Sequence, residues 1–562
     1  MAAEAGQSRH DHRRRARLGA QAGRTRGAAG ARLAPCYSIP TCSIQAIHGR
    51  IGMRGFLIMA AAVLAASPAW ALPAEAWQRD LTALREAYAA THPSPWHKLS
   101  RAEFDRMADR LAADIPSLDD RQVMARMIEL IAATGEGHTR LTLPLPEDAG
   151  VFLGHAKTEA PKLPVFATLP IRLTAASDGY LVTAAAPEYR RLVGAALVSI
   201  DGKPVAAIEA AMLPLVNGDN AGMKRAYLPS FIMLPDLLRV RGLTAANEAR
   251  WRFRFPSGRE VEERLSALPD GADLAWAKEP DTPIFGLLPL DGGIVVARIS
   301  EIGNAPDQSL AAFADKIYAA VDQTPDARLV IDLRGNPGGN NFLIDPVVRG
   351  AIARPALWKP GHLFVLIDAK TFSAAQNLVN AMERWTPALL VGEPTGGAPS
   401  SYGDSKRITL PESGLTLRVS SLYWQDTGPL DKRDATAPHV AAPRTVADLQ
   451  TGRDPALAAI ALLSRPQGSA QGSWAAPFTY VYRPATLRVR FGRDGGSFAV
   501  PELKLAETPF QSVTLNGSDV TATGKVRDSV FTLRAQSTAG GLVGWLDVNG
   551  RPYPFVAKRA AE

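Results

Sequence analysis

The stretch that decides the fold runs from residue 329 to residue 340 and reads LVIDLRGNPGGN. A short apolar run predicts a buried strand, and the glycines after it predict a tight turn. Glycine permits positive φ angles, so such a turn can direct backbone N–H groups toward one anion. Gly338 and Gly339 are therefore candidate donors of an oxyanion hole. No Lys-Ser or Lys-Thr follows them, which excludes a phosphate-binding loop.

A second strand ends in a turn of small residues between positions 365 and 376, which read VLIDAKTFSAAQ. A helix is expected to begin at or near Ser373, at the positive end of the helix dipole. In one interpretation Ser373 is a nucleophile, and its own N–H or that of Ala374 faces the same oxyanion as Gly338. In the other, Ser373 and Gln376 form a capping box without a chemical role.

The region 284–465 alternates between apolar strands and helical patterns, which predicts an α/β layer with a largely parallel sheet. A third strand enters another glycine turn at 390–397, where the sequence reads LVGEPTGG. Adjacent parallel strands place their carboxyl ends at one edge of a sheet, where open α/β sheets bind ligands. We therefore expect the turns around Gly338 and Ser373 to lie side by side.

The rest of the body has other patterns. Apolar residues at three- and four-residue spacing predict helices in 74–134, and short β-like runs follow in 163–265. Within these runs, 193–205 resembles the hairpin of PDZ domains; a small β-rich insert without a ligand is the alternative. The tail, 474–562, alternates apolar and polar residues, which is typical of an antiparallel β domain. The fold class expected is multidomain α+β.

The front end has the pattern of a secretory signal peptide in residues 53–71. Met-Arg-Gly precedes an apolar run from Phe56 to Ala66, and an Ala-x-Ala site ends at Ala71. The run is too short to span a bilayer comfortably, so we expect cleavage after Ala71 and a periplasmic or secreted protein. An uncleaved anchor is the alternative. Residues 1–52 are either an extension from an upstream start codon or a disordered basic arm.

We therefore expect six segments. They are a basic extension (1–52), a signal peptide (53–71), an N-terminal helical domain (72–162), a PDZ-like domain (163–265), a catalytic domain (266–465) and a small β domain (466–562).

Charge and cysteine usage exclude several classes of function. The formal net charge of +8 arises from the first 71 residues, which hold ten arginines and two acidic residues. The remainder is balanced, so it offers no argument for nucleic acid or an anionic membrane. Cys36 and Cys42 both lie in this leader, which excludes a cysteine nucleophile in the body. No His-Glu-x-x-His, Cys/His cluster or dinucleotide fingerprint is present, and we expect neither a metal nor a cofactor.

In this order, the motifs at 332–339, 371–375 and 391–397 resemble the tail-specific, or C-terminal-processing, serine protease family. The resemblance covers roughly 284–465 and implies a crotonase/ClpP-like core. It implies that Ser373 attacks the scissile carbonyl, and that the oxyanion hole is formed by Gly338, Gly339 and Ala374.

Processing proteases of this family usually have a lysine as general base in a Thr-x-Gly-Lys-Gly context. Here residues 395–399 read TGGAP, and the nearest lysine is Lys406, in a differently patterned segment. The departure favours the tricorn-like branch of the family, which uses serine, histidine and a carboxylate.

His138 is the best candidate for the base in such a site. It lies in Gly-Glu-Gly-His-Thr, which resembles the family's Asp-Gly-His-Thr segment, and a neutral imidazole suits proton abstraction near pH 7. A histidine that merely ends a helix in a polar turn is the alternative. His362 is less favoured because it lies inside a predicted strand, and His439 because it replaces part of a family Pro-Asp pair.

The third group should orient the imidazole and stabilise its charged form. The segment 427–438 resembles the stretch that supplies this carboxylate in tricorn-like members. Asp431 is the first candidate and Asp434 its competitor.

These residues predict an exported serine peptidase that hydrolyses a polypeptide substrate through an acyl-enzyme. One alternative is a hydrolase of esters or other acyl compounds with the same site. The other is a catalytically inert exported peptide-binding protein on a protease scaffold, which the missing family lysine favours.

Overall fold

The structure of the protein is a computed structural model that describes residues 71–145, 163–269, 272–277 and 283–560. The predicted basic extension (1–52) and all but the last residue of the predicted signal peptide (53–71) lie outside the described residues. Within the described part, no helix combines the length and the apolar character needed to cross a membrane.

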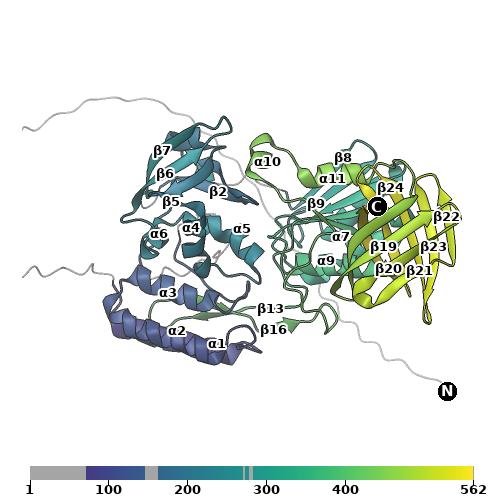
Figure 1. Cartoon of the computed structure of the whole chain (residues 1–562). Coiled ribbons are helices and arrows are strands. Elements are labelled where there is room, and N and C mark those ends of the chain that lie inside the picture. The colour runs from purple at the N-terminus through teal and green to yellow at the C-terminus, as the bar shows by residue number, and fades with distance from the viewer. Residues whose placement is uncertain (1–70, 146–162, 270–271, 278–282, 561–562) are drawn as a thin grey trace, which may run out of the picture. The chain divides into compact units, whose positions relative to one another are not determined.

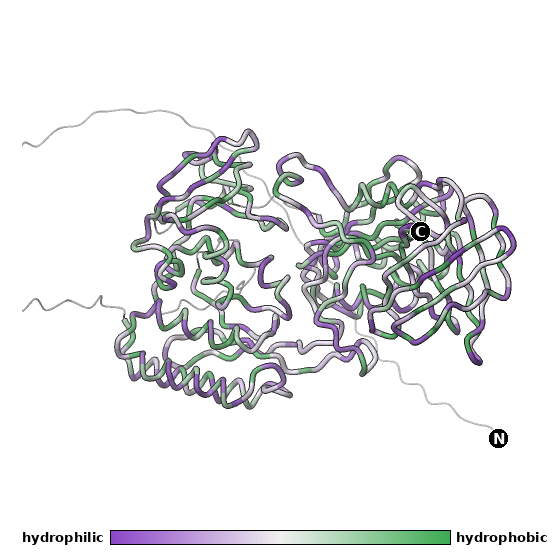
Figure 2. The backbone as a smooth tube through the Cα atoms, in the orientation of Figure 1, coloured by the Kyte–Doolittle hydropathy of each residue, from purple (hydrophilic) through white to green (hydrophobic). Residues whose placement is uncertain are grey.

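Three helices form the N-terminal region, as the apolar spacing predicted (Figure 1). Their bounds are Ala74–Thr91 (α1), Arg101–Asp114 (α2) and Asp120–Ala132 (α3). Capping boxes begin α2 and α3, with Ser100 and Asp119 as the N-cap residues. Hydrophobic and hydrophilic residues alternate along these helices (Figure 2), and their apolar faces join one core with the segment that follows.

The segment between 163 and 266 is built on an antiparallel sheet in the order β2-β3-β4-β6-β7, with β5 paired to β4. Its strands are Ile171–Ala176 (β2), Gly179–Ala185 (β3), Ala196–Ile200 (β4), Lys203–Pro204 (β5), Glu248–Arg254 (β6) and Glu260–Ser266 (β7). Asp201 and Gly202 both have positive φ angles and make the turn between β4 and β5. The assignment of this sheet to a PDZ-like domain stays a prediction.

The same segment also contains helices, which the sequence patterns did not predict. They are Val205–Met212 (α4), Ala221–Ile232 (α5) and Pro235–Val240 (α6). Two features hid α5: Pro229 lies inside it, and its buried residues follow no narrow stripe because several of its sides are covered. This helix packs against β2.

The central sheet has six strands in the order β17-β12-β11-β10-β9-β8. They are Phe285–Leu290 (β8), Ile294–Ile299 (β9), Arg328–Asp332 (β10), Leu363–Ile367 (β11), Leu389–Gly392 (β12) and Val440–Ala441 (β17). Only β8 is antiparallel to its neighbour, so the predicted parallel sheet is confirmed. The continuous burial of β10, β11 and β12 is typical of parallel strands covered on both faces.

Different elements cover the two faces of this sheet. One face packs against Leu310–Gln323 (α7), Asp345–Ile352 (α8) and Ala374–Trp385 (α9). The other packs against Pro455–Leu463 (α11) and against Val543 and Val556 of the C-terminal sheet. Both faces of the central sheet are therefore covered. The edge where β10, β11 and β12 end is the place at which such a sheet can bind a ligand.

Two small sheets and a short helix complete this part of the fold. The first sheet joins Arg140–Leu141 (β1), Thr416–Val419 (β15) and Lys406–Thr409 (β14). The second pairs Ser401–Gly403 (β13) with Leu422–Trp424 (β16), and the helix is Val446–Thr451 (α10). The strand β1 is only two residues long, because the backbone up to Thr139 is bent.

The C-terminal region is one antiparallel sheet of nine strands in the order β21-β20-β19-β18-β26-β25-β24-β23-β22, which confirms the expected β tail. The strands are Gly472–Tyr480 (β18), Arg483–Gly492 (β19), Gly495–Val500 (β20), Leu505–Pro509 (β21), Ser512–Asn516 (β22), Asp519–Val526 (β23), Ser529–Thr538 (β24), Gly541–Val548 (β25) and Arg551–Arg559 (β26). The Trp545 indole N–H donates to the Trp358 carbonyl, which ties this sheet to the central one.

Candidate active site

The glycine turn after β10 and the turn after β11 are joined by one buried residue, Asn336. Its amide N–H₂ donates to the Ile299 carbonyl at 2.8 Å, and its Oδ1 accepts the Gly338 N–H at 2.9 Å. Its own carbonyl accepts the Phe372 N–H at 3.1 Å. The predicted closeness of the two turns is therefore present. A Cβ built on Gly338 would lie 2.5 Å from the Ser373 Cβ, so only glycine fits there.

Ser373 does not cap its helix with its side chain. It has φ 54° and ψ −125°, and no cap hydrogen bond from its side chain is formed. Positive φ at a non-glycine residue costs about 1–3 kcal/mol and marks positions over-determined by their surroundings. The capping-box interpretation of Ser373 and Gln376 is therefore wrong, because the Gln376 amide turns instead to Asn380 and Thr436.

His138 reaches Ser373 from 235 residues away in the chain. Its Nε2 lies 3.1 Å from the Ser373 Oγ, within hydrogen-bond reach. The ring lies against Phe372, with centroids 4.3 Å apart. The preceding Gly137 leaves the space that this approach needs, since a Cβ there would lie 2.7 Å from the Phe372 ring.

The environment of His138 favours its neutral imidazole. Burial lowers the pKa of His138 below its usual value, while the negative charge of Asp219 opposes that shift. The His138 Nδ1 is buried and has no hydrogen-bond partner among the described residues. A neutral ring whose Nε2 faces a serine hydroxyl is suited to accept its proton.

Asp219 is the carboxylate that the sequence patterns missed. It lies in the loop before α5, and its two oxygens accept the N–H groups of Gly137 at 2.8 Å and of Ala398 at 3.3 Å. It therefore fixes the residue before His138 and the glycine turn after β12 at once. No motif marked it, because it belongs to a loop of the inserted segment.

The neighbouring Asn220 extends this connection. Its side-chain oxygen caps α5 by accepting the Met223 N–H, and its amide N–H₂ donates to the carbonyls of Thr395, Gly396 and Asp434. The start of α5 is thus attached to two loops of the catalytic region. The inserted segment is in this way part of the framework around Ser373.

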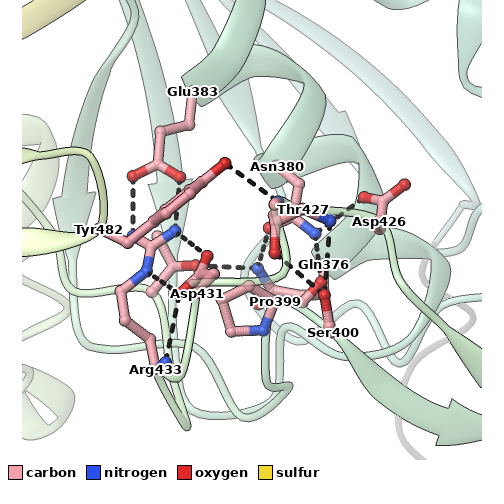
Figure 3. Close-up of polar contacts among 12 residues, drawn as sticks. Gln376, Asn380, Glu383, Pro399, Ser400, Asp426, Thr427, Asp431, Arg433 and Tyr482 are labelled. Atoms are coloured by element: carbon pink, nitrogen blue, oxygen red, sulfur yellow. Dashed lines mark hydrogen bonds and ion pairs between the residues drawn. The ribbon is translucent and has the colours of Figure 1, made fainter.

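Asp431 does not contact His138. Its carboxylate forms an ion pair with Arg433 at 2.8 Å, and Arg433 in turn binds both oxygens of Glu383 on α9 (Figure 3). Its side chain is 1% exposed. The competitor, Asp434, contributes its backbone carbonyl to Asn220. In this arrangement neither predicted carboxylate orients the imidazole.

The loop that carries Asp431 is held by the C-terminal sheet. The Tyr482 hydroxyl accepts the Gly428 N–H at 3.1 Å, and the Arg433 guanidinium lies over the Tyr482 ring (Figure 3). On the other side of the loop, Asp426 accepts a hydrogen bond from Asn380 of α9. The loop is therefore clamped between the helix that begins after Ser373 and a turn of the β tail.

The candidate oxyanion donors divide into two groups. The Gly338 N–H is engaged by Asn336. The N–H groups of Gly339 and Ala374 have no acceptor among the described residues. A Cβ on Gly339 would lie 2.2 Å from the Ile302 carbonyl oxygen, so this backbone also requires glycine. Gly338 thus shapes the turn, and Gly339 and Ala374 offer the unengaged donors.

Two histidines of lower rank have other roles. The His439 ring is buried and its Nδ1 accepts the Leu390 N–H at 2.9 Å; burial lowers its pKa to about 4. His362 lies 3.1 Å from Asp326. The contacts of both rings are with groups other than the Ser373 hydroxyl.

Among the described residues, one group could in principle hold a cation: His92, His97 and Glu136. However, the His92 Nδ1 accepts the Ser94 N–H, so the proton of a neutral ring is on Nε2, which faces Glu136 at 2.7 Å. A protonated Nε2 cannot bind a metal. The geometry is better explained by a contact between the neutral His92 ring and the Glu136 carboxylate that supports the His138 turn, since Glu136 also accepts the Thr139 hydroxyl.

A cavity of about 880 Å³ opens at the same sheet edge, between the central sheet and the inserted segment. It is lined by residues after β10, β11 and β12 and by parts of β2 and α5. Five of its lining residues are cationic: Arg225, Arg298, Arg334, Lys370 and Arg444. Three are acidic: Asp368, Glu393 and Asp434. Its volume is in the range of ligand sites.

Comparison with known proteins gives one family match, which is to a peptidase family. Residues 346–441, which contain Ser373, match the sequence model of peptidase family S41. The branch within the family is not resolved by this match. No curated protein matches the sequence.

Several solved structures are similar at low identity. Mature CPAF complexed with lactacystin is 13% identical, with 70% of this chain and 98% of that chain covered and a TM-score of 0.49. The photosystem II D1 C-terminal processing protease is 15% identical, with 65% and 92% covered and a TM-score of 0.33. A putative peptidase from Parabacteroides merdae is 13% identical, with 69% and 96% covered and a TM-score of 0.36.

Proposed function

We propose that the protein is an exported peptidase that cleaves polypeptides through an acyl-enzyme on Ser373, with His138 as general base. The observation that carries this proposal is the 3.1 Å approach of the His138 Nε2 to the Ser373 Oγ. The two residues come from distant segments, and the serine is held at a positive φ angle that glycine would ordinarily occupy. A histidine base also accounts for the missing family lysine, which supports the tricorn-like branch as part of this proposal.

The steps follow from the positions of these groups. As the Ser373 Oγ bonds to the scissile carbonyl carbon, its proton moves to the His138 Nε2. The carbonyl oxygen becomes an oxyanion, and the N–H groups of Gly339 and Ala374 donate to it. When the C–N bond breaks, Nε2 returns the proton to the leaving amine. Water then attacks the acyl-enzyme with His138 again as base, which releases the acid and restores the serine.

The charged form of His138 needs a nearby negative charge during these steps. Asp219 supports this role through its hydrogen bond to the Gly137 N–H and its upward effect on the His138 pKa. We assign the stabilisation to Asp219, with Asp431 as the competing candidate from the family pattern. The PDZ-like segment would present the peptide end.

A fluorophosphonate probe tests the nucleophile directly, because it phosphonylates only an activated serine. The full chain should be labelled, Ser373→Ala should not, and His138→Ala should react about 10²–10⁴-fold more slowly. Lys406→Ala is the matched control for the lysine-dependent branch and should react like the parent. A folded parent that stays unlabelled would support the inert-scaffold alternative. Labelling without cleavage of any peptide in a library, but with turnover of acyl esters, would support the ester hydrolase.

Export is part of the proposal and has its own support. The Leu72 N lies 3.3 Å from the Asp120 Oδ1, which also accepts the Trp77 indole N–H at 2.8 Å. Cleavage after Ala71 would turn this nitrogen into an ammonium group and strengthen the bond to the carboxylate. N-terminal sequencing of the protein from periplasm and medium should give Leu72 as the first residue. An intact leader on membrane-bound protein would contradict export by cleavage.

A further inference from the structure

Phe342 is an exposed aromatic residue close to the glycine turn. It lies in the single 3₁₀ turn Asn341–Leu343, three residues after Gly339, and its side chain is 82% exposed. No other large apolar residue in the described ranges is more exposed. A single exposed ring is common on protein surfaces, but an exposed ring next to a second aromatic residue is informative, because contiguous apolar patches mark binding surfaces.

Trp424 is the aromatic neighbour of Phe342. Their ring centroids are 6.4 Å apart at an interplanar angle of 66°, the edge-to-face arrangement that aromatic pairs prefer. The Trp424 indole N–H donates to the Asp404 carboxylate, which fixes its ring at the end of β16. The pair therefore consists of one held ring and one free ring.

This pair is continuous with the Ser373–His138 site. A Cβ built on Gly403 would lie 3.4 Å from Trp424 and 3.8 Å from the His138 ring, so the indole and the imidazole are separated only by a glycine. On the other side, Phe342 follows the turn whose Gly338 abuts Ser373. Trp424 thus lies on the His138 side of Ser373, and Phe342 lies on the side of the glycine turn.

We propose that Phe342 and Trp424 form a subsite for one large apolar side chain of the peptide, next to the scissile bond. The occupant is a Phe- or Leu-sized side chain, because two edge-to-face rings offer apolar surface. The polar group of the pair, the Trp424 indole N–H, already donates to Asp404. This inference rests on the proposed peptidase function. It adds the substrate class: polypeptides with a bulky apolar residue near the cut, rather than small or charged residues.

The test uses the full chain and pairs of internally quenched peptides that differ only in Phe against Ala at one position. At the position nearest the cut, the parent should cleave the Phe peptide with a kcat/KM about 10–100-fold above that of the Ala peptide. Phe342→Ala and Trp424→Ala should bring this ratio close to one, and Phe342→Leu should restore most of it. Trp385→Ala is the control, because Trp385 is 51% exposed but lies at the far end of α9, about 18 Å along the helix from Ser373.

Each outcome decides one question. A Phe-to-Ala ratio that stays at the parent value in Phe342→Ala and Trp424→Ala would overturn the subsite, provided that the parent is labelled by the fluorophosphonate. A parent that is folded but unlabelled would refute the peptidase proposal instead. Thermal unfolding of each variant separates lost selectivity from lost folding, and Phe342→Ala is the decisive variant because so little of its side chain is packed.

Discussion

The turn around Ser373 and the loop that carries Asp431 are built in different ways, although both adjoin α9. In the turn, the contacts join backbone groups of neighbouring motifs, with Asn336 as the buried link. In the loop, side chains meet partners that are distant in sequence, notably Glu383 and Tyr482. Backbone geometry can thus be inferred from a local motif, whereas the direction of a carboxylate depends on residues that no motif contains.

The first test of this difference removes Arg433, the partner of the buried Asp431 carboxylate. Arg433→Ala leaves Asp431 and Glu383 without their shared cation, and breaking a buried pair costs about 3–5 kcal/mol. We expect a clear loss in the free energy of unfolding, measured by urea denaturation. A double variant, Arg433→Ala with Asp431→Ala, should recover part of that loss. An unchanged midpoint in the single variant would show that the cluster does not hold the loop.

The second test compares Asp219 and Asp431 by their effects on catalysis. In Asp219→Asn, loss of the negative charge lowers the pKa of His138 further and leaves the imidazolium less stabilised. The labelling rate should therefore fall about 10–100-fold at neutral pH, by analogy with other lost charge stabilisation of roughly 1.4–2.7 kcal/mol. Its decline in acid should also move to lower pH.

Asp431→Asn is the matched variant in this pair. Because Asp431 contacts Arg433 and not His138, it should lower stability while the acid limb of the rate profile stays at the parent position. The reverse pattern, with the pH profile moved by Asp431→Asn and not by Asp219→Asn, would show that Asp431 is the third catalytic member.

The smallest effect is expected from the contact between the loop and the β tail. Tyr482→Phe removes the acceptor of the Gly428 N–H but keeps the ring beneath Arg433, so a loss of about 1 kcal/mol in the free energy of unfolding is expected. Tyr480→Phe, on the same hairpin, is the control. Tyr482→Ala should lower stability more than Tyr482→Phe; equal losses would assign no role to the ring.

Local patterns predicted much of the fold. The strands ending at Asp332 and Ile367, the helix after Ser373 and the antiparallel tail all follow from short apolar runs and turn residues. The helices of the inserted segment were missed, because α5 is buried on several sides and shows no amphipathic stripe.

The candidate site was predictable to the extent that it depends on motifs. The sequence indicated Ser373, His138 and the glycine turn, and the structure brings these three together. It could not indicate that Asp219 would lie beside Gly137, since that depends on how the insert packs. It also suggested Gly338 as a donor, which the Asn336 side chain precludes by engaging its N–H.

Val543 and Val556 of the C-terminal sheet pack against the central sheet, so the catalytic region depends on the β tail for part of its core. The predicted boundary near residue 465 separates two patterns in the sequence, but the strands on its far side complete the cover of an apolar face that includes Val330 and Phe364. A recombinant fragment that stops at this boundary would keep α11 but leave part of that face uncovered, and it should aggregate. The β tail and the catalytic region should therefore be expressed together as one unit.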